Sequence, residues 1–321
     1  MNNYSWLHQK LHHVALSSQY MREITFDVEN SLISPNNKNE NHVFISGLAR
    51  SGSTILLNAL YKSNEFSSLT YKDMPFVLAP NLWSRLSFHK HSNKLSERAH
   101  ADGIEISENS PEAFEEIFWM TFYRDSNNKK KFKNYVELIN HKYSKKRYLS
   151  KNNQNIRRLE LISNIFPNSK ILIPYRNPIQ HAHSLYYQHQ KFIEESKKDI
   201  FISKYMKWLG HTEFGANYVP IINKNLHYED DLNINHWLEQ WYLIYKNCIQ
   251  TFKKKRNIHF ICYEKLCNSK EYWFDILKIA NIMDSYDYEF KESHKDISHV
   301  INNNIIKKTL ALYKEITCLA S

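Results

Sequence analysis

The sequence predicts an α/β fold, with a central, mostly parallel sheet of about five strands between two layers of helices. Short apolar runs rich in β-branched and aromatic residues alternate with longer segments of helical periodicity. Only 5 Gly and 8 Pro occur among 321 residues, which excludes collagen-like and linker-rich chains. Hydrophobic residues make up 42% of the chain and aromatic residues 14%, enough to bury a large core.

Five runs are the candidate strands. The clearest are residues 42–46, 170–175 and 258–263, which are apolar throughout their centres and are expected to be buried on both faces. Residues 68–71 and 147–150 are shorter and more polar candidates.

Helical patterns lie between these strands. Residues 53–62 follow a glycine turn, and Asn177-Pro178 supplies a capping residue and a proline at the first helical position. Two apolar stripes have helical spacing, one formed by Ile156, Leu159, Ile162 and Ile165 and the other by Trp237, Trp241, Ile244, Tyr245, Cys248 and Ile249.

The chain is expected to form one domain over residues 1–321. Residues 1–40 would be an N-terminal extension of helix and loop. Residues 80–146 separate two strands by far more than one crossover helix needs, which predicts a helical insertion that shapes a binding site.

Membrane, secreted and zinc-binding classes are not indicated. No apolar run approaches the roughly 18 residues of a membrane span, and the N-terminus lacks the apolar segment of a signal peptide. Cys248, Cys262, Cys267 and Cys318 form no C-x-x-C pair and have no metal-ligand spacing. We therefore expect a soluble, cytoplasmic protein with reduced cysteines.

Positive charge is concentrated in residues 124–158, which we call the basic band. It holds twelve Lys or Arg against two acidic residues, whereas residues 104–117 hold five Glu and no basic residue. Such a band is either a solvated helix face or a field that concentrates an anionic ligand.

The most informative segment is HVFISGLARSGSTILL, residues 42–57. Gly47 and Gly52 lie five apart between a strand and a helix, where backbone N–H groups and the helix N-terminus form an anion cradle. The spacing matches the P-loop pattern except that Ser53 replaces the lysine that reaches nucleotide phosphates. Arg50 instead places a guanidinium in the loop.

A second segment, ILIPYRNPIQHAHSLYY, spans residues 171–187. Arg176 ends a strand, and Ser184 lies two turns into the next helix, so that both side chains can converge on one phosphate. The alternative is a surface arginine and a buried helix serine. Three histidines, His181, His183 and His189, lack the spacing of metal ligands on one helix face and are expected to be solvated or close to phosphate.

Together these segments resemble the P-loop-like sulfotransferases that use 3′-phosphoadenylyl sulfate (PAPS) and release adenosine 3′,5′-bisphosphate (PAP). The resemblance implies that the loop binds the 5′-phosphosulfate and that Arg176 and Ser184 bind the 3′-phosphate. The segments CYEKL, residues 262–266, and YLSKN, residues 148–152, extend it. Nucleotide-binding residues implied in this way are Arg50, Ser51, Gly52, Ser53, Thr54, Arg176, Ser184 and Tyr263.

The implied reaction is in-line transfer of a sulfonate to an acceptor hydroxyl, without a metal. Arg50 and Lys151 would stabilise the sulfonate and the leaving group. Asp73 is the expected general base, against the alternative of a carboxylate paired with Lys72 or Arg85, and His89 or His91 could replace it as the base. The glycine-rich C-terminal loop of many family members has no counterpart in residues 297–307, so the roles of Ser298 and Lys307 stay open.

The same residues also bear on other possible functions. A P-loop kinase or other nucleotide-binding phosphotransferase would require Mg²⁺ and an aspartate at the end of a second strand, which neither candidate strand supplies. Nucleic-acid binding ranks third, because the basic band lacks interleaved stacking aromatics. A homologue that binds the nucleotide without catalysis is a further alternative. The acceptor hydroxyl is expected on a saccharide or glycolipid.

Overall fold

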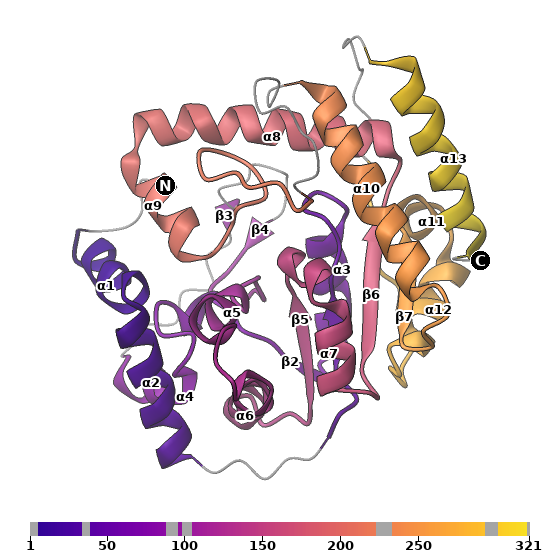
Figure 1. Ribbon diagram of the computed structural model, residues 1–321. Coiled ribbons are helices and arrows are strands. Elements are labelled where there is room, and N and C mark those ends of the chain that lie inside the picture. The colour runs from indigo at the N-terminus through magenta and orange to yellow at the C-terminus, as the bar shows by residue number, and fades with distance from the viewer. Residues whose placement is uncertain are drawn as a thin grey trace.

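The computed structural model describes residues 6–33, 39–87, 96–97, 105–222, 233–292 and 301–319. Its centre is a five-stranded, all-parallel sheet with helices on both sides, which confirms the predicted α/β fold (Figure 1). The strand order is β2-β5-β1-β6-β7. The strands are β1 (Val43–Ile45), β2 (Phe66–Ser67), β5 (Arg147–Lys151), β6 (Lys170–Tyr175) and β7 (Ile258–Cys262).

Strand register brings three carboxyl ends to one edge of the sheet. Ile45 of β1 lies opposite Lys151 of β5 and Leu172 of β6. The chain leaves β1 toward β2 at one side of the sheet and leaves β6 toward β7 at the other. Ligands of open α/β sheets bind where neighbouring strands send their connections in opposite directions, so this edge between β1 and β6 is the expected site.

The two sheet faces bury different layers. Val43 and Ile45 point into a core with α3 (Ser53–Tyr61) and α12 (Lys270–Ile279). Phe44 points to the other face, where the core is built from several helices. These are α6 (Asn128–Lys142), α7 (Leu159–Ile165), α10 (Ile234–Phe252) and α13 (Asn303–Leu319).

The helices predicted after β1 and β6 are present. α3 begins at Ser53, and α8 (Pro178–Lys198) begins after Asn177, whose side chain accepts hydrogen bonds from the amides of Ile179 and Gln180. α8 runs across the carboxyl end of the sheet, and α9 (Ile200–Trp208) follows it (Figure 1).

The second strand and the insertion differ from expectation. β2 covers Phe66–Ser67 rather than residues 68–71, because Thr70 pairs with Pro111 and the chain then turns into the 3₁₀ helix η1 (Tyr71–Asp73). The described part of the insertion also includes an antiparallel strand pair. Its elements before α6 are α4 (Pro80–Leu86), β3 (Ser96–Glu97), β4 (Glu105–Ile106) and α5 (Glu116–Phe122).

Part of the insertion also belongs to the core. Phe132, Val136 and Ile139 of α6 are fully buried in the cluster that contains Phe44. The N-terminal helices α1 (Trp6–Ser17) and α2 (Gln19–Leu32) pack beside it, and no described helix is both long and apolar enough to cross a bilayer.

Candidate active site

The loop between β1 and α3 forms an anion cradle. Gly52 precedes the first residue of α3 with φ of 90°, and no side chain caps this helix end. The first backbone N–H groups of α3 therefore point out of the helix, and no capping side chain accepts a hydrogen bond from them. Ser51 adds a hydroxyl that is fully buried without a hydrogen-bond partner among the described residues, as expected of a group that a ligand completes.

Two glycines of the loop are required by space. A Cβ at Gly47 would lie 2.7 Å from the Pro174 side chain and its carbonyl oxygen. A Cβ at Gly52 would lie 2.3 Å from Cδ2 of Tyr263, and the φ of Gly52 is in the region that only glycine adopts readily. The loop is therefore packed tightly against β6 and Tyr263.

Arg50 connects the loop to α8. Its φ of 67° is unusual for a residue with a side chain, and such conformations concentrate at functional sites. Its Nε donates a hydrogen bond to Oγ of Ser184, 3.2 Å away. The structure thus brings together Arg50 and Ser184, which the sequence predicts as anion-binding residues in two separate segments.

Arg176 and Tyr263 lie on the other side of the loop. Arg176 follows the last residue of β6, with its guanidinium carbon 5.8 Å from the centre of the Tyr263 ring. Tyr263 is buried and begins α11 (Tyr263–Asn268), and its hydroxyl donates to the carbonyl of Lys291 at 2.9 Å. The Tyr263 ring is therefore close both to Gly52 of the loop and to the Arg176 guanidinium.

Glu264 holds these elements together. Its Oε1 accepts a hydrogen bond from the backbone amide of Asn177 at 2.6 Å, and its Oε2 accepts one from the Tyr313 hydroxyl at 3.1 Å. Because Asn177 directly follows Arg176 and caps α8, Glu264 fixes the start of the helix that carries Ser184.

Lys151 lies at the same edge. It is the last residue of β5, it is 7% exposed, and its Cα is paired with that of Ile45, two residues before Gly47. The turn after β5 contacts the loop directly, because Oγ of Ser53 donates to Oδ1 of Asn153 at 3.4 Å. Lys151 and the loop between β1 and α3 are thus neighbours.

Asp73 has the environment of a structural carboxylate. It is fully buried and accepts hydrogen bonds from the Thr70 amide at 2.6 Å and the Tyr143 hydroxyl at 2.7 Å. It also forms an ion pair with Lys142, rather than with Lys72 or Arg85. Both oxygens of Asp73 thus already have partners within the fold, an arrangement typical of a structural carboxylate.

His89, His91 and Ser298 lie outside the described residues. Lys307 lies in the first turns of α13, and no contact places it in the site.

A histidine–glutamate pair that no sequence motif marked lies near Lys151. In the segment after α9, Nδ1 of His211 lies 3.7 Å from Oε2 of Glu213. Gln154, three residues after Lys151, donates to Oε1 of Glu213 at 3.2 Å. Burial alone would raise the pKa of Glu213, but His211 and the charge of Lys151 together hold that pKa below its ordinary value.

The histidines of α8 are buried rather than solvated. His181 is fully buried, and its Nε2 is 2.7 Å from the carbonyl oxygen of Ala49 in the loop. Burial, with smaller effects of Arg176 and Arg50, lowers the pKa of His181 to about 3. A neutral His181 therefore donates to the loop backbone and supports its shape. His42 is also buried, at the opposite sheet edge.

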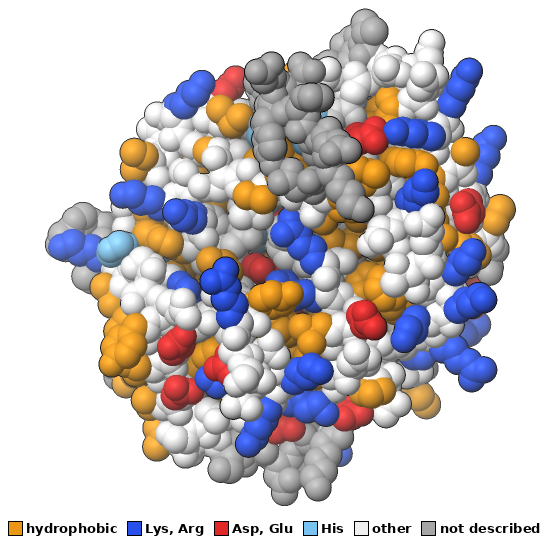
Figure 2. All heavy atoms as spheres, viewed as in Figure 1, with side chains coloured by type: hydrophobic (Ala, Val, Ile, Leu, Met, Phe, Trp, Pro, Cys, Tyr) orange, Lys and Arg blue, Asp and Glu red, His pale blue; other side chains and the backbone are white. Residues whose placement is uncertain are grey.

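The basic band extends to both ends of the sheet. Figure 2 shows Lys and Arg side chains scattered among acidic and apolar ones on one face of the molecule. At the carboxyl edge the band supplies Lys151, Arg157 and Arg158, whereas Arg147 begins β5 at the amino edge. Several members pair with acids in the fold: Lys131 with Asp125, Lys133 with Glu40, Lys142 with Asp73 and Arg147 with Glu65.

Two solved structures resemble this chain. Sulfotransferase STF1 from Mycobacterium tuberculosis is 10% identical, with a TM-score of 0.48 over 99% of this chain and 87% of that one. Sulfotransferase STF9 from Mycobacterium avium is 9% identical, with a TM-score of 0.47 over 98% of this chain and 79% of that one. No curated protein sequence matches.

The sequence itself carries the assignment. The sequence model of the sulfotransferase family matches residues 42–277, which is more than half of the chain and runs from β1 through the phosphate loop, Lys151, Arg176 and Tyr263. The chain belongs to the sulfotransferase family.

Proposed function

We propose that the protein transfers a sulfonate group from PAPS to an acceptor hydroxyl. The observation that carries this proposal is the convergence of Arg50, Ser184 and Arg176 around the uncapped start of α3. Two anion-binding elements at neighbouring strand ends suit a nucleotide with phosphate at both its 5′ and 3′ positions, which distinguishes PAPS from ATP.

The donor would lie across the β1–β6 edge. In the proposed roles, Arg176 and Ser184 bind the 3′-phosphate and the Tyr263 ring flanks the nucleotide. The 5′-phosphosulfate would occupy the loop, held by amides and hydroxyls of Ser51, Gly52, Ser53 and Thr54.

Transfer would follow in-line displacement at sulfur. The acceptor oxygen forms a bond to sulfur while the bond from sulfur to the bridging oxygen of the donor breaks, and PAP leaves with the electron pair. Lys151 and Arg50 would stabilise the charge that develops on the bridging oxygen and the sulfonate, so that the protein's own cations serve this role.

His211 is the base that this geometry favours. The acceptor hydroxyl must lose a proton during transfer, and both oxygens of Asp73 are already held by partners within the fold. Nδ1 of His211 faces Glu213, which leaves Nε2 to accept the proton while the carboxylate stabilises the charged ring. Gln154 ties this pair to the turn that carries Lys151.

No finding favours the kinase alternative. Ser53 stands where the lysine of a P-loop kinase would be, and its hydroxyl is directed to Asn153.

The donor class is tested by thermal shift with PAP and with ATP, each with and without Mg²⁺. We expect stabilisation by PAP that does not depend on Mg²⁺ and that is lost in Arg176→Ala. Arg256→Ala is the matched control, because Arg256 is exposed and lies before β7 at the amino edge of the sheet. Stabilisation by Mg·ATP alone would contradict the proposal.

A further inference from the structure

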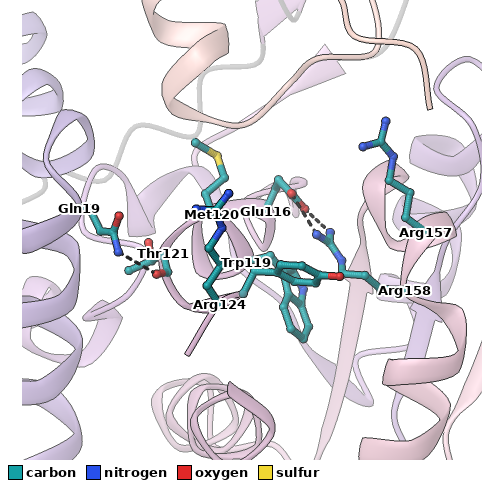
Figure 3. A pocket seen from close by; sticks show the side chains of 9 residues that line it. Gln19, Glu116, Trp119, Met120, Thr121, Arg124, Arg157 and Arg158 are labelled. Atoms are coloured by element: carbon teal, nitrogen blue, oxygen red, sulfur yellow. Dashed lines mark hydrogen bonds and ion pairs between the residues drawn. The ribbon is translucent and has the colours of Figure 1, made fainter. Parts of the chain in front are cut away.

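A pocket of about 470 Å³ lies beside the proposed transfer centre. It opens between the start of α2, the helix α5, and the 3₁₀ helix η2 (Asn153–Arg157) that follows β5 (Figure 3). Its volume is in the range of small-molecule sites. The lining residues are Gln19, Glu116, Trp119, Met120, Thr121, Tyr123, Arg124, Arg157 and Arg158.

One of the three arginines in this pocket is already neutralised. Arg158 pairs with Glu116 through both of its terminal nitrogens, and its guanidinium lies 5.0 Å from the centre of the Trp119 ring. Figure 3 shows this pair on the wall of the pocket. Arg158 is therefore a fixed part of the wall rather than an available charge.

The other two arginines, Arg124 and Arg157, form no direct ion pair with a carboxylate of the described residues. Arg124 is exposed, and no acidic side chain of the described chain pairs with it. Arg157 donates to the carbonyl oxygen of Pro220 at 3.0 Å and forms no ion pair with a described acid. Burial and the nearby Arg158 lower the pKa of Arg157, and the charges of Glu116 and Glu213 offset only part of this effect. An anion in the pocket would relieve this unfavourable environment.

The pocket adjoins the residues proposed for catalysis. Asn152, the residue after Lys151, donates to Oε2 of Glu116 at 2.8 Å. On the opposite side, a Cβ at Gly210 would lie 2.5 Å from Cγ of Glu116 and 2.6 Å from Sδ of Met120. Because Gly210 precedes His211, the pocket wall connects the Lys151 turn with the segment of the proposed base.

Besides the arginines and Glu116, the lining combines the polar Gln19 and Thr121 with three apolar or aromatic side chains, Trp119, Met120 and Tyr123. Tyr123 is 55% exposed and Met120 is 39% exposed, so each offers apolar surface at the mouth of the pocket. Apolar and aromatic faces suit the less polar side of a ring, while guanidinium groups bind carboxylate, phosphate or sulfate through paired hydrogen bonds.

We infer that this pocket binds the acceptor, and that the acceptor is a hydroxyl-bearing ring compound that carries its own oxyanion, recognised by Arg124 and Arg157. This inference rests on the proposed function and adds the substrate class to it. The enzyme would then place a sulfonate on a molecule that is already negatively charged.

Matched sugars test the inference by isothermal titration calorimetry, with and without PAP. Methyl β-D-glucuronide and glucose 6-phosphate carry an oxyanion, and methyl β-D-glucoside has a similar ring without one. We expect at least one anionic sugar to bind about tenfold or more tightly than the glucoside, since hydrogen bonds to charged groups are the strong ones. Arg124→Gln and Arg157→Gln should each remove most of this preference, and the Arg256→Gln control should retain it.

The outcomes separate the two proposals. Equal binding of the neutral and anionic sugars, failure of both anionic sugars to bind, or the same loss in Arg256→Gln overturns the acceptor inference. PAP affinity is measured on the same samples. If the wild-type protein does not bind PAP, the proposed function is overturned instead. PAP affinity that is unchanged in Arg124→Gln shows that this variant is folded.

Discussion

Nε of Arg50 donates a hydrogen bond to Oγ of Ser184 across 134 positions of sequence. This contact joins the loop after β1 to the helix after β6, and those two strands are neighbours in the sheet. The two segments that we propose to bind the donor's phosphates are thereby joined, and Arg50 in this contact has a backbone conformation that is unusual for a residue with a side chain.

Ser184→Ala tests the value of this contact. The substitution removes the hydroxyl that both Arg50 and the proposed 3′-phosphate use, so PAP affinity should fall by about tenfold, as expected for hydrogen bonds to charged groups. Titration calorimetry with PAP measures the change. Ser196→Ala on the same helix is the control, and an equal effect of both substitutions would contradict the role of Ser184.

Gly52→Ala tests the shape of the loop. The added methyl group would collide with the Tyr263 ring at a φ of 90°, so the loop must move and its amides lose their alignment. We expect the free energy of unfolding to fall by about 1–3 kcal/mol. We expect the binding free energy of PAP to fall by more than this. Wild-type PAP affinity in this variant would show that the loop does not hold the phosphate.

The sequence was sufficient for elements whose signal is local. A buried strand, a glycine turn and a capped helix each depend on neighbouring residues, and β6 begins and ends where the apolar run predicts. The insertion was less predictable, because α6 is amphipathic like any surface helix and only tertiary contacts show that Phe132 and Val136 pack on the sheet. His211 and Glu213 have no motif, and only the fold brings them near Lys151.

Asp73→Asn separates a structural carboxylate from a catalytic one. The change leaves the half-buried Lys142 without its counter-charge and weakens the hydrogen bond that the Tyr143 hydroxyl donates, so the free energy of unfolding should fall by about 1–3 kcal/mol. Chemical denaturation should show this loss, while the folded fraction should retain a kcat within about tenfold of the wild-type value. A loss of kcat by several orders of magnitude with unchanged stability would restore Asp73 as the base.

His211→Gln has the opposite expected signature. The glutamine amide can donate a hydrogen bond to Glu213 but cannot take the acceptor's proton, so kcat should fall by about 10²–10⁴ with little change in the free energy of unfolding. In the wild-type protein kcat should depend on pH through a single deprotonation, and this dependence should disappear in the variant. A variant that keeps the wild-type pH profile would exclude His211 from proton transfer.

Acid stability should depend on His181. Its pKa is about 3 in the folded protein, below the ordinary value of 6.5, because burial disfavours the charged ring. Between these two pH values the unfolded chain binds a proton that the folded chain does not, so stability falls as pH falls, by about 1.4 kcal/mol per pH unit for each such histidine. His42, with a pKa of about 3 lowered chiefly by burial, contributes in the same direction. Denaturation of wild type and His181→Asn between pH 7 and pH 4 measures the slope. The variant should be less stable at pH 7 and should lose less stability on acidification, and equal slopes would show that His181 is not neutral in the fold.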